Sequence, residues 1–324
     1  MLRLRGMPVG RVWSASGARG FLGKGYWYHP VLRTVLLGQY GFKGSVFTAR
    51  TTTLEPRKGN MPFLRDGITP RDLLPRCIYV NPIHNFALNA VGLSGPGAEE
   101  LFRRRQWNVA AEYGQMMFLS FMAVEKTREA RLEELRQFVK LADWYLGESV
   151  PYVGLQINVS CPNVGLHFDP KELVDEVHEM LAIANVLGIP LVVKTDPLFD
   201  PEALCAIARS PYCDAVTPSN TIPFAKLPEE TRYKLFSNGV SPLWRYGGGG
   251  CSGEPCLELS LNNIWMLKIL RISKPVFAGN GITHPDHVGQ FKDVGADGIS
   301  VGAAAFLRPH NLQRIIQRGN YVFS

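Results

Sequence analysis

The sequence predicts a single (β/α)₈ barrel, because strand-like and helix-like segments alternate along most of its length. Short apolar runs rich in β-branched residues precede stretches with helical periodicity, a succession typical of parallel βαβ units. The runs are apolar on both faces, as expected for strands that are covered on both sides. Eight such runs in 324 residues favour a closed barrel over the alternative, an open doubly wound sheet. We therefore expect one domain over residues 1–324.

The second half of the chain shows the alternation most clearly. One helical segment there begins near Pro170, a residue suited to a first helical turn. A long irregular segment ending at Cys256 separates two of the strands. In chain order the eight predicted strands are 12–16, 45–53, 118–124, 153–160, 190–196, 214–220, 275–280 and 298–303. The predicted helices of this half are 169–187, 201–209, 257–271, 284–294 and 311–318.

Composition and charge narrow the functional classes. Hydrophobic residues make up 46% of the chain and no low-complexity tract is present, which indicates a folded globular protein. The net charge of +7 suits an anionic cofactor and substrate as well as nucleic acid, and we expect no nucleic-acid partner. The longest apolar run is too short to span a bilayer, and the basic N-terminus lacks the apolar stretch of a secretory signal. We expect a cytoplasmic protein without a membrane anchor.

The six cysteines show no metal-ligand spacing. None forms a Cys-x-x-Cys pair or has the spacing of a zinc or iron–sulfur site, so we expect no metal and reduced thiols. Cys161 is distinct, because it follows the fourth predicted strand and is flanked by Ser160 and Pro162, which favour a loop. A thiol with a pKa of about 8.5 can act as a general base near neutral pH, although a lone cysteine is more often a small core residue.

Polar residues at the C-terminal ends of the predicted strands are the candidate site, since catalytic groups of barrels lie there. Asn is depleted in strands, yet Asn158, Asn220 and Asn280 fall in or at the end of one. Asn89 and Asn163 are expected in loops that follow apolar stretches. Amide side chains carry donors and an acceptor, so a ring of them suits a flat ligand whose edge alternates N–H and C=O groups. Helix capping and Asx turns are the alternative for any single one of them.

Lys194 lies inside the apolar run 190–196. A lysine in such a place is unfavourable unless it meets a negative charge or a polar ligand. A cofactor ring that becomes anionic on reduction would supply that charge. The alternative is a structural ion pair with Asp196 or Asp214.

Small residues follow the last two predicted strands. In barrels these positions often bind a phosphate through backbone N–H groups, and small side chains allow the close approach that this requires. Ordinary tight turns are the alternative. The candidates are Gly279, Gly281, Gly302 and Ala303.

Together these residues resemble the dihydroorotate dehydrogenase family, over nearly the whole chain. The most specific motifs are NVSCPN (158–163), VVKTDPLFD (192–200), SNT (219–221), GGGCSGEP (248–255) and GNGI (279–282). The segment ARTTTLEPRKGNMP (49–62) also matches the family's early region. The resemblance implies an FMN-dependent oxidation of dihydroorotate to orotate, a step of pyrimidine biosynthesis, on a TIM barrel.

The resemblance also implies a role for each matching residue. Cys161 would remove the C5 proton of dihydroorotate, while a hydride moves from C6 to flavin N5. Lys194 would contact the flavin near N1 and O2, and Arg50 stands where the soluble class usually has a catalytic-site Lys. The orotate ring and its carboxylate would be bound by Asn89, Asn158, Asn163, Asn220 and Thr221. FMN would be bound by Ser16, Gly17, Thr51, Asn158, Lys194, Gly249, Gly250, Ser252, Gly279, Gly281, Gly302 and Ala303.

Features of two classes of the family are mixed. Cys161 is typical of the soluble class, which forms homodimers, whereas GGGCSGEP resembles the membrane-associated class. Arg50 keeps the charge of a Lys without its geometry. No additional N-terminal pair of helices is expected, which favours a soluble enzyme. The electron acceptor stays open between fumarate, a quinone and NAD through a partner subunit.

Two other functions remain open. One is a dihydrouracil-type dehydrogenase, in which a His is typical at the position of Asn163. The other is a non-catalytic FMN-binding barrel, which the unusual Arg50 keeps in consideration.

Overall fold

The computed structural model describes residues 2–107, 116–147, 152–160 and 170–324. Its central sheet has eight parallel strands in the order β10-β9-β8-β7-β4-β3-β14-β13. A parallel bridge between Val216 and Val276 joins the two edges and closes the barrel. The strands are β3 (Val12–Ser14), β4 (Val46–Thr48), β7 (Met117–Phe121), β8 (Val153–Asn158), β9 (Leu191–Thr195), β10 (Ala215–Pro218), β13 (Phe277–Gly279) and β14 (Gly298–Val301). The predicted barrel and its eight strands are confirmed.

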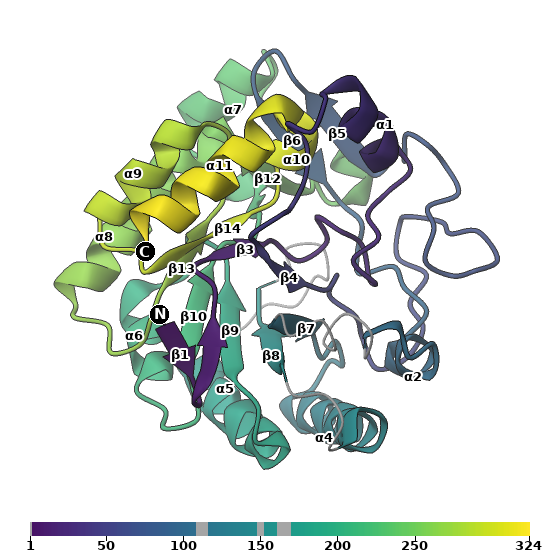
Figure 1. Cartoon of the computed structure of the whole chain (residues 1–324), viewed down its shortest axis with the longest axis vertical. Coiled ribbons are helices and arrows are strands. Elements are labelled where there is room, and N and C mark those ends of the chain that lie inside the picture. Colours follow the sequence, from purple (N-terminus) through teal and green to yellow (C-terminus); the bar gives the residue numbers. More distant parts are fainter. Residues whose placement is uncertain (1, 108–115, 148–151, 161–169) are drawn as a thin grey trace.

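Helices surround the barrel and cover its outer face (Figure 1). Several of them begin at side-chain caps. The Thr127 hydroxyl accepts a hydrogen bond from the Ala130 amide, and the Asp200 carboxylate accepts hydrogen bonds from the Glu202 and Ala203 amides. No helix in the described part of the chain is long and apolar enough to cross a membrane. The helices are α1 (Tyr28–Val35), α2 (Ala98–Arg103), α4 (Arg128–Leu146), α5 (Pro170–Ala184), α6 (Pro201–Ala208), α7 (Glu229–Leu235), α8 (Leu257–Ile269), α9 (Pro285–Asp293), α10 (Ala304–Leu307) and α11 (Pro309–Val322). The five predicted helices correspond to α5, α6, α8, α9 and α11.

Two small sheets outside the barrel were not expected from the sequence. β1 (Leu2–Leu4) and β2 (Met7–Val9) form an antiparallel hairpin. A four-stranded antiparallel sheet has the order β11-β12-β6-β5. Its strands are β5 (Ile78–Asn81), β6 (Phe86–Asn89), β11 (Ile222–Pro223) and β12 (Gly250–Gly253). The segment expected to be irregular therefore contributes two strands to this sheet. Such short strands carry little periodic signal, because pairing with a partner distant in sequence determines them.

The barrel interior changes in character along its axis. Near the N-terminal ends of the strands, the Trp13 ring stacks on Phe277 with centroids 3.7 Å apart and lies 4.5 Å from Phe118. Two glycines make room for these rings, because a Cβ at Gly154 would collide with Phe118 and one at Gly298 with Phe277. This aromatic layer fills one end of the barrel. The C-terminal ends of the strands are therefore the place where interior side chains can meet a ligand.

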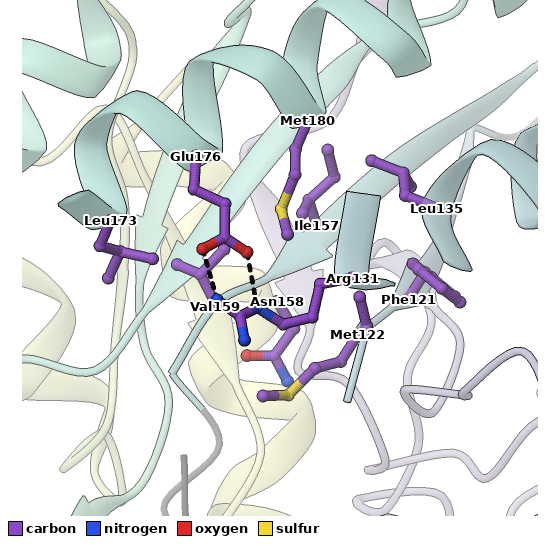
Figure 2. A pocket seen from close by; sticks show the side chains of 11 residues that line it. Phe121, Met122, Arg131, Leu135, Ile157, Asn158, Val159, Leu173, Glu176 and Met180 are labelled. Atoms are coloured by element: carbon purple, nitrogen blue, oxygen red, sulfur yellow. Dashed lines mark hydrogen bonds and ion pairs between the residues drawn. The ribbon is translucent and has the colours of Figure 1, made fainter. Parts of the chain in front are cut away.

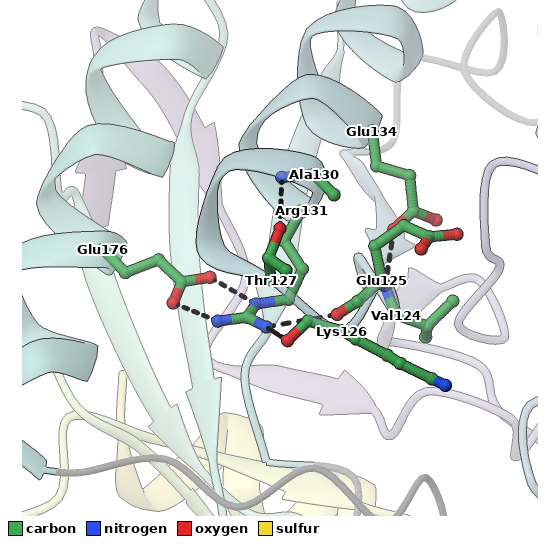
Figure 3. Close-up of polar contacts among 8 residues, drawn as sticks. All are labelled: Val124, Glu125, Lys126, Thr127, Ala130, Arg131, Glu134 and Glu176. Atoms are coloured by element: carbon green, nitrogen blue, oxygen red, sulfur yellow. Dashed lines mark hydrogen bonds and ion pairs between the residues drawn. The ribbon is translucent and has the colours of Figure 1, made fainter.

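A buried ion pair joins α4 to α5 beside the ends of β7 and β8 (Figure 3). Arg131 Nε and Nη2 each donate to a carboxylate oxygen of Glu176 at 2.6 Å, and both side chains are less than a tenth exposed. Arg131 Nη1 donates to the carbonyls of Glu125 and Lys126. Glu134 accepts hydrogen bonds from two amides of the same loop. The loop that follows β7 is thus held to both helices.

We expect Arg131→Met to lower the free energy of unfolding by about 3–5 kcal/mol, because the Glu176 carboxylate would stay buried without this cation. Adding Glu176→Leu should restore most of the loss, since two apolar side chains carry no desolvation penalty. Denaturant unfolding measures both effects. Arg136→Met is the control: it removes an exposed cation of the same helix and should change stability by less than about 0.5 kcal/mol. An equally small loss of unfolding free energy for Arg131→Met would contradict the role of the Arg131–Glu176 pair in stability.

Candidate active site

Asn158, Lys194 and Thr217 occupy one level of the barrel on three neighbouring strands. Asn158 on β8 pairs with Lys194 on β9, and Lys194 pairs with Thr217 on β10. All three are buried. They alternate with Ile157 and Val193, which belong to the large core that includes the helices. The three polar side chains therefore face the barrel interior, toward the C-terminal side of the aromatic layer.

A chain of hydrogen-bonded side chains crosses four strands at this end. Thr51 Oγ1 lies 3.0 Å from Ser16 Oγ and 2.8 Å from Ser120 Oγ. Asn158 Nδ2 donates to Thr51 Oγ1 at 3.4 Å, and Ser120 Oγ donates to Gln156 Oε1 at 3.2 Å. The structure thus brings together Ser16, Thr51 and Asn158, as the sequence predicted. Sequence reasoning missed Ser120 and Gln156, because they lie inside strands rather than at their ends.

Asn220 extends this chain toward β10. Its Nδ2 donates to Asn158 Oδ1 at 3.2 Å and to the Ser160 carbonyl at 2.8 Å. Its Oδ1 accepts a hydrogen bond from the Thr221 amide at 3.0 Å. Three residues predicted to bind one substrate, Asn158, Asn220 and Thr221, are therefore in contact. Cys161 and Asn163 lie outside the described residues, and Ser160 is the last described residue before them.

Asn280 ties the small sheet to the barrel rim. Its Nδ2 donates to the carbonyls of Asn220 and Cys251 at 3.1 and 3.2 Å, and its Oδ1 accepts a hydrogen bond from the Gly253 amide at 3.3 Å. Its φ of 68° lies in the left-handed region, which Asn tolerates better than most residues. In the sequence, Asn280 stands out only as an unusual residue at the end of a predicted strand. Its bridging role depends on β12, which the sequence did not predict.

The expectation of a loop at Asn89 is wrong, because Asn89 is the last residue of strand β6 and reaches the rim from there. It pairs with Gly250 on β12, and its Nδ2 lies 3.5 Å from the Gly250 carbonyl. Gly249 has a φ of +77°, and a Cβ there would lie 2.9 Å from the Asn89 carbonyl oxygen. Only glycine allows this approach. Ser252 follows on the same strand. The predicted residues Asn89, Gly249, Gly250 and Ser252 therefore form one unit.

The predicted phosphate-binding residues lie on neighbouring strand ends. Gly279 pairs with Ser300, so the turns that contain Gly281 and Gly302 follow adjacent strands. A Cβ at Gly279 would lie 2.7 Å from the Ser300 carbonyl oxygen. Ala303 directly precedes α10. Gly17, three residues after β3, has a φ of +93°, and the nearest atom to a Cβ built there is Arg50 Cγ at 4.0 Å, which leaves room beside its backbone.

Arg50 lies at the same rim with its side chain buried. Its Nη2 donates to the Ser94 carbonyl at 3.2 Å. Its guanidinium carbon lies 5.0 Å from the Phe21 ring centroid and 5.2 Å from that of Phe63. A cation between two aromatic rings is well stabilised. Arg50 thus takes part in the loops above the barrel, unlike Thr51, whose side chain joins the hydrogen-bonded chain.

Asp196 and Asp214, the two acidic residues considered as ion-pair partners of Lys194, lie in different environments. The Asp214 carboxylate accepts hydrogen bonds from Arg5 Nε and the Leu191 amide, both at 2.7 Å, at the opposite end of the barrel. Burial raises the pKa of the Asp196 carboxyl, which is the opposite of the shift that a dominant cation partner produces. The contacts of Asp214 therefore lie away from the candidate site.

A narrow pocket lies between α4, α5 and the ends of β7 and β8 (Figure 2). Apolar side chains such as Met122, Leu135 and Met180 make up most of its wall. Its charged members are Arg131 and Glu176, which neutralise each other. Asn158 is the only amide side chain among the described residues that line this pocket, whereas at the rim it is joined by Asn220, so the rim offers more partners to a polar ligand.

The comparisons with known proteins agree with one another. A family model described as dihydroorotate dehydrogenase matches residues 31–320. The chain is 27% identical over 271 residues to the catalytic subunit of dihydroorotate dehydrogenase B (NAD(+)) of Maridesulfovibrio salexigens, covering 82% of this chain and 77% of that protein. It is 27% identical over 321 residues to the same subunit of Desulforamulus reducens, covering 93% and 86%. A ligand-free DHODH of Eimeria tenella superimposes with a TM-score of 0.68 at 16% identity, over 98% of this chain and 86% of that one, which shows the shared fold.

Proposed function

The chain belongs to the dihydroorotate dehydrogenase family, and we propose that it oxidises dihydroorotate to orotate with FMN as its cofactor. It is an oxidoreductase that acts on CH–CH donors. The observation that supports dihydroorotate as the substrate is the contact between Asn158 and Asn220 beside Lys194. A dihydropyrimidine ring with a carboxylate presents the alternating N–H and C=O groups that such amides bind.

The rim residues fit a flavin mononucleotide by the chemistry of their donors. Ser16 and Thr51 offer hydroxyls, and Lys194 is a buried cation suited to a ring that gains negative charge. The small residues after β13 and β14 suit the phosphate. When bound, FMN supplies at N5 the acceptor for the hydride from substrate C6. The remaining residues that would bind it are Gly17, Asn158, Gly249, Gly250, Ser252, Gly279, Gly281, Gly302 and Ala303.

The amides would orient the substrate for loss of a proton at C5 and a hydride at C6. Several of their present contacts are 3.2–3.4 Å long, beyond the usual optimum near 2.9 Å, so exchanging them for ligand contacts costs little. Cys161 would take the C5 proton, and loss of both hydrogens leaves the C5=C6 double bond of orotate. The residues that would bind the substrate are Asn89, Asn158, Asn163, Asn220 and Thr221.

For the electron acceptor, we propose NAD⁺ reached through a partner subunit. Both relatives described above are named as NAD(+) enzymes and as catalytic subunits, which supports this choice over fumarate or a quinone. A cytoplasmic location and a homodimer stay predictions.

Anaerobic addition of dihydroorotate to the purified flavoprotein tests the proposal. We expect the oxidised flavin absorbance to disappear, and a screen of acceptors for its return identifies the acceptor. Bleaching by dihydrouracil alone would favour the dihydrouracil-type enzyme. No bleaching by either compound would favour the non-catalytic barrel.

We expect Asn280→Gly to raise the dissociation constant of FMN by about tenfold, because three hydrogen bonds that hold β12 against the rim are lost. Glycine tolerates the positive φ, so the change isolates the side chain. Asn280→Ala removes the same bonds and adds backbone strain, and should therefore bind FMN no better. Fluorescence of released flavin measures the affinity. An unchanged affinity in both variants would show that Asn280 does not position the site.

A further inference from the structure

The two ends of the chain meet outside the barrel and contain no acidic residue. Residues 1–54 hold eight Lys and Arg and residues 298–324 hold three, without any Asp or Glu, whereas residues 55–297 hold 24 basic and 28 acidic residues. The ends are in contact, since Gln313 on α11 donates to the Lys43 carbonyl and Asn320 to the Gly44 carbonyl, both at 2.9 Å. The net charge of +7 therefore arises from two adjoining segments.

A pocket of about 500 Å³ lies between these segments. Arg19, Arg33 and Lys43 line it, and none of its eleven lining residues is acidic. Among the described residues, none of these three cations forms an ion pair with a carboxylate. The pocket thus concentrates positive charge without an internal counter-charge.

Arg19 is the least exposed of the three cations. Its guanidinium carbon lies 4.9 Å from the Phe47 ring centroid and 5.5 Å from that of Phe42. Burial, and secondly the charge of Arg33, lowers the pKa of Arg19 from its ordinary value. Two guanidinium groups that repel each other beside apolar rings are stabilised by an anion between them.

Two buried polar groups, one lining the pocket and one beside it, have no hydrogen-bond partner within the described parts of the chain. Tyr40, which lines it, is 2% exposed, and its hydroxyl has no hydrogen-bond partner among the described residues. The same holds for Nε2 of His29, whose ring centroid lies 5.4 Å from that of Tyr40. Burial, and secondly Arg33, lowers the pKa of His29 to about 4, so that this imidazole adds no charge at neutral pH. A buried hydroxyl without a partner is unfavourable, and an anion would accept its hydrogen bond.

We propose that this pocket binds a phosphate monoester, with Arg19, Arg33 and Lys43 as the cations and the Tyr40 hydroxyl as a neutral donor. A dianion matches several cations, and planar guanidinium groups fit phosphate oxygens two at a time. The phosphate belongs either to a soluble ester or to a lipid headgroup. The lipid source is included because α1 and its N-cap expose Trp27, Val31 and Val35 at intervals of four residues beside Arg33.

Calorimetric titration of the flavin-loaded protein with glycerol phosphate tests the soluble source. Bound flavin occupies the rim site, so the titration reports on a different one. We expect saturable binding that Arg33→Gln and Lys43→Gln each weaken roughly tenfold, because each removes a charged donor. Tyr40→Phe should weaken the binding of glycerol phosphate several-fold. The melting temperature of this variant without ligand should not fall, since the removed hydroxyl had no hydrogen-bond partner among the described residues. Lys140→Gln makes the same charge change on an exposed site of α4 and should bind like the parent.

Sedimentation with vesicles tests the lipid source. Binding to phosphatidic acid vesicles but not to phosphatidylcholine vesicles, reduced in Arg33→Gln, would assign the phosphate to a headgroup if glycerol phosphate does not bind. Saturable binding of glycerol phosphate assigns it to a soluble ester. The proposal is overturned if neither probe binds, or if Arg33→Gln, Lys43→Gln and Tyr40→Phe all bind like Lys140→Gln.

Discussion

Cys161→Ala is expected to lower kcat for dihydroorotate oxidation by about 10²–10⁴-fold, because alanine cannot accept the C5 proton. The flavin should stay bound, since the residues proposed to hold it are unchanged. Anaerobic stopped-flow measurement of flavin reduction gives the rate directly. Cys205→Ala is the matched control: it removes a thiol from the core at α6, away from the rim, and should reduce flavin at the parental rate.

The pH dependence adds a second test of the same base. A general base must be deprotonated, so the rate of flavin reduction should rise with pH and level off above the pKa of the Cys161 thiol, about 8.5 if unperturbed. Cys161→Ser should need a higher pH, because a hydroxyl gives up its proton less readily. If Cys161→Ala reduces flavin at the parental rate at neutral pH, Cys161 is not the general base.

The barrel could be predicted because its strands carry local signals. The run Val153–Asn158 is mostly apolar and ends in a polar residue, which places Asn158 at the rim without knowledge of any partner. The same logic located Lys194 and Asn220. Contacts between these residues followed from the closed sheet alone, because a barrel brings all its strand ends to one rim.

The features that the sequence did not predict depend on contacts with residues that are distant in the chain. β12 is strand-like only because it pairs with β6, about 160 residues earlier, and the role of Asn280 depends on that pairing. Ser120 gave no signal, because a single Ser inside an apolar run does not reveal which barrel layer it occupies. The side-chain partners of Arg50 come from loops, whose conformation periodicity does not determine.

Lys194→Met is expected to raise the dissociation constant of FMN by about tenfold to a hundredfold, or to slow flavin reduction by a similar factor, because the cation that offsets charge on the reduced ring is lost. Methionine keeps most of the apolar stem, so the packing of β9 changes little. Flavin release and stopped-flow reduction measure the two effects. Lys234→Met, which removes an exposed cation of α7, is the control.

Stability with and without flavin separates the two explanations of Lys194. A residue that serves the cofactor contributes to the melting temperature only in the loaded protein, because ligand binding stabilises the folded state in proportion to its affinity. A structural ion pair would contribute in both forms, since its partner would stay buried and uncompensated after the substitution. We therefore expect Lys194→Met to narrow the difference in melting temperature between the loaded and flavin-free proteins. An equal loss in both forms, with normal flavin affinity and reduction, would return Lys194 to a structural role.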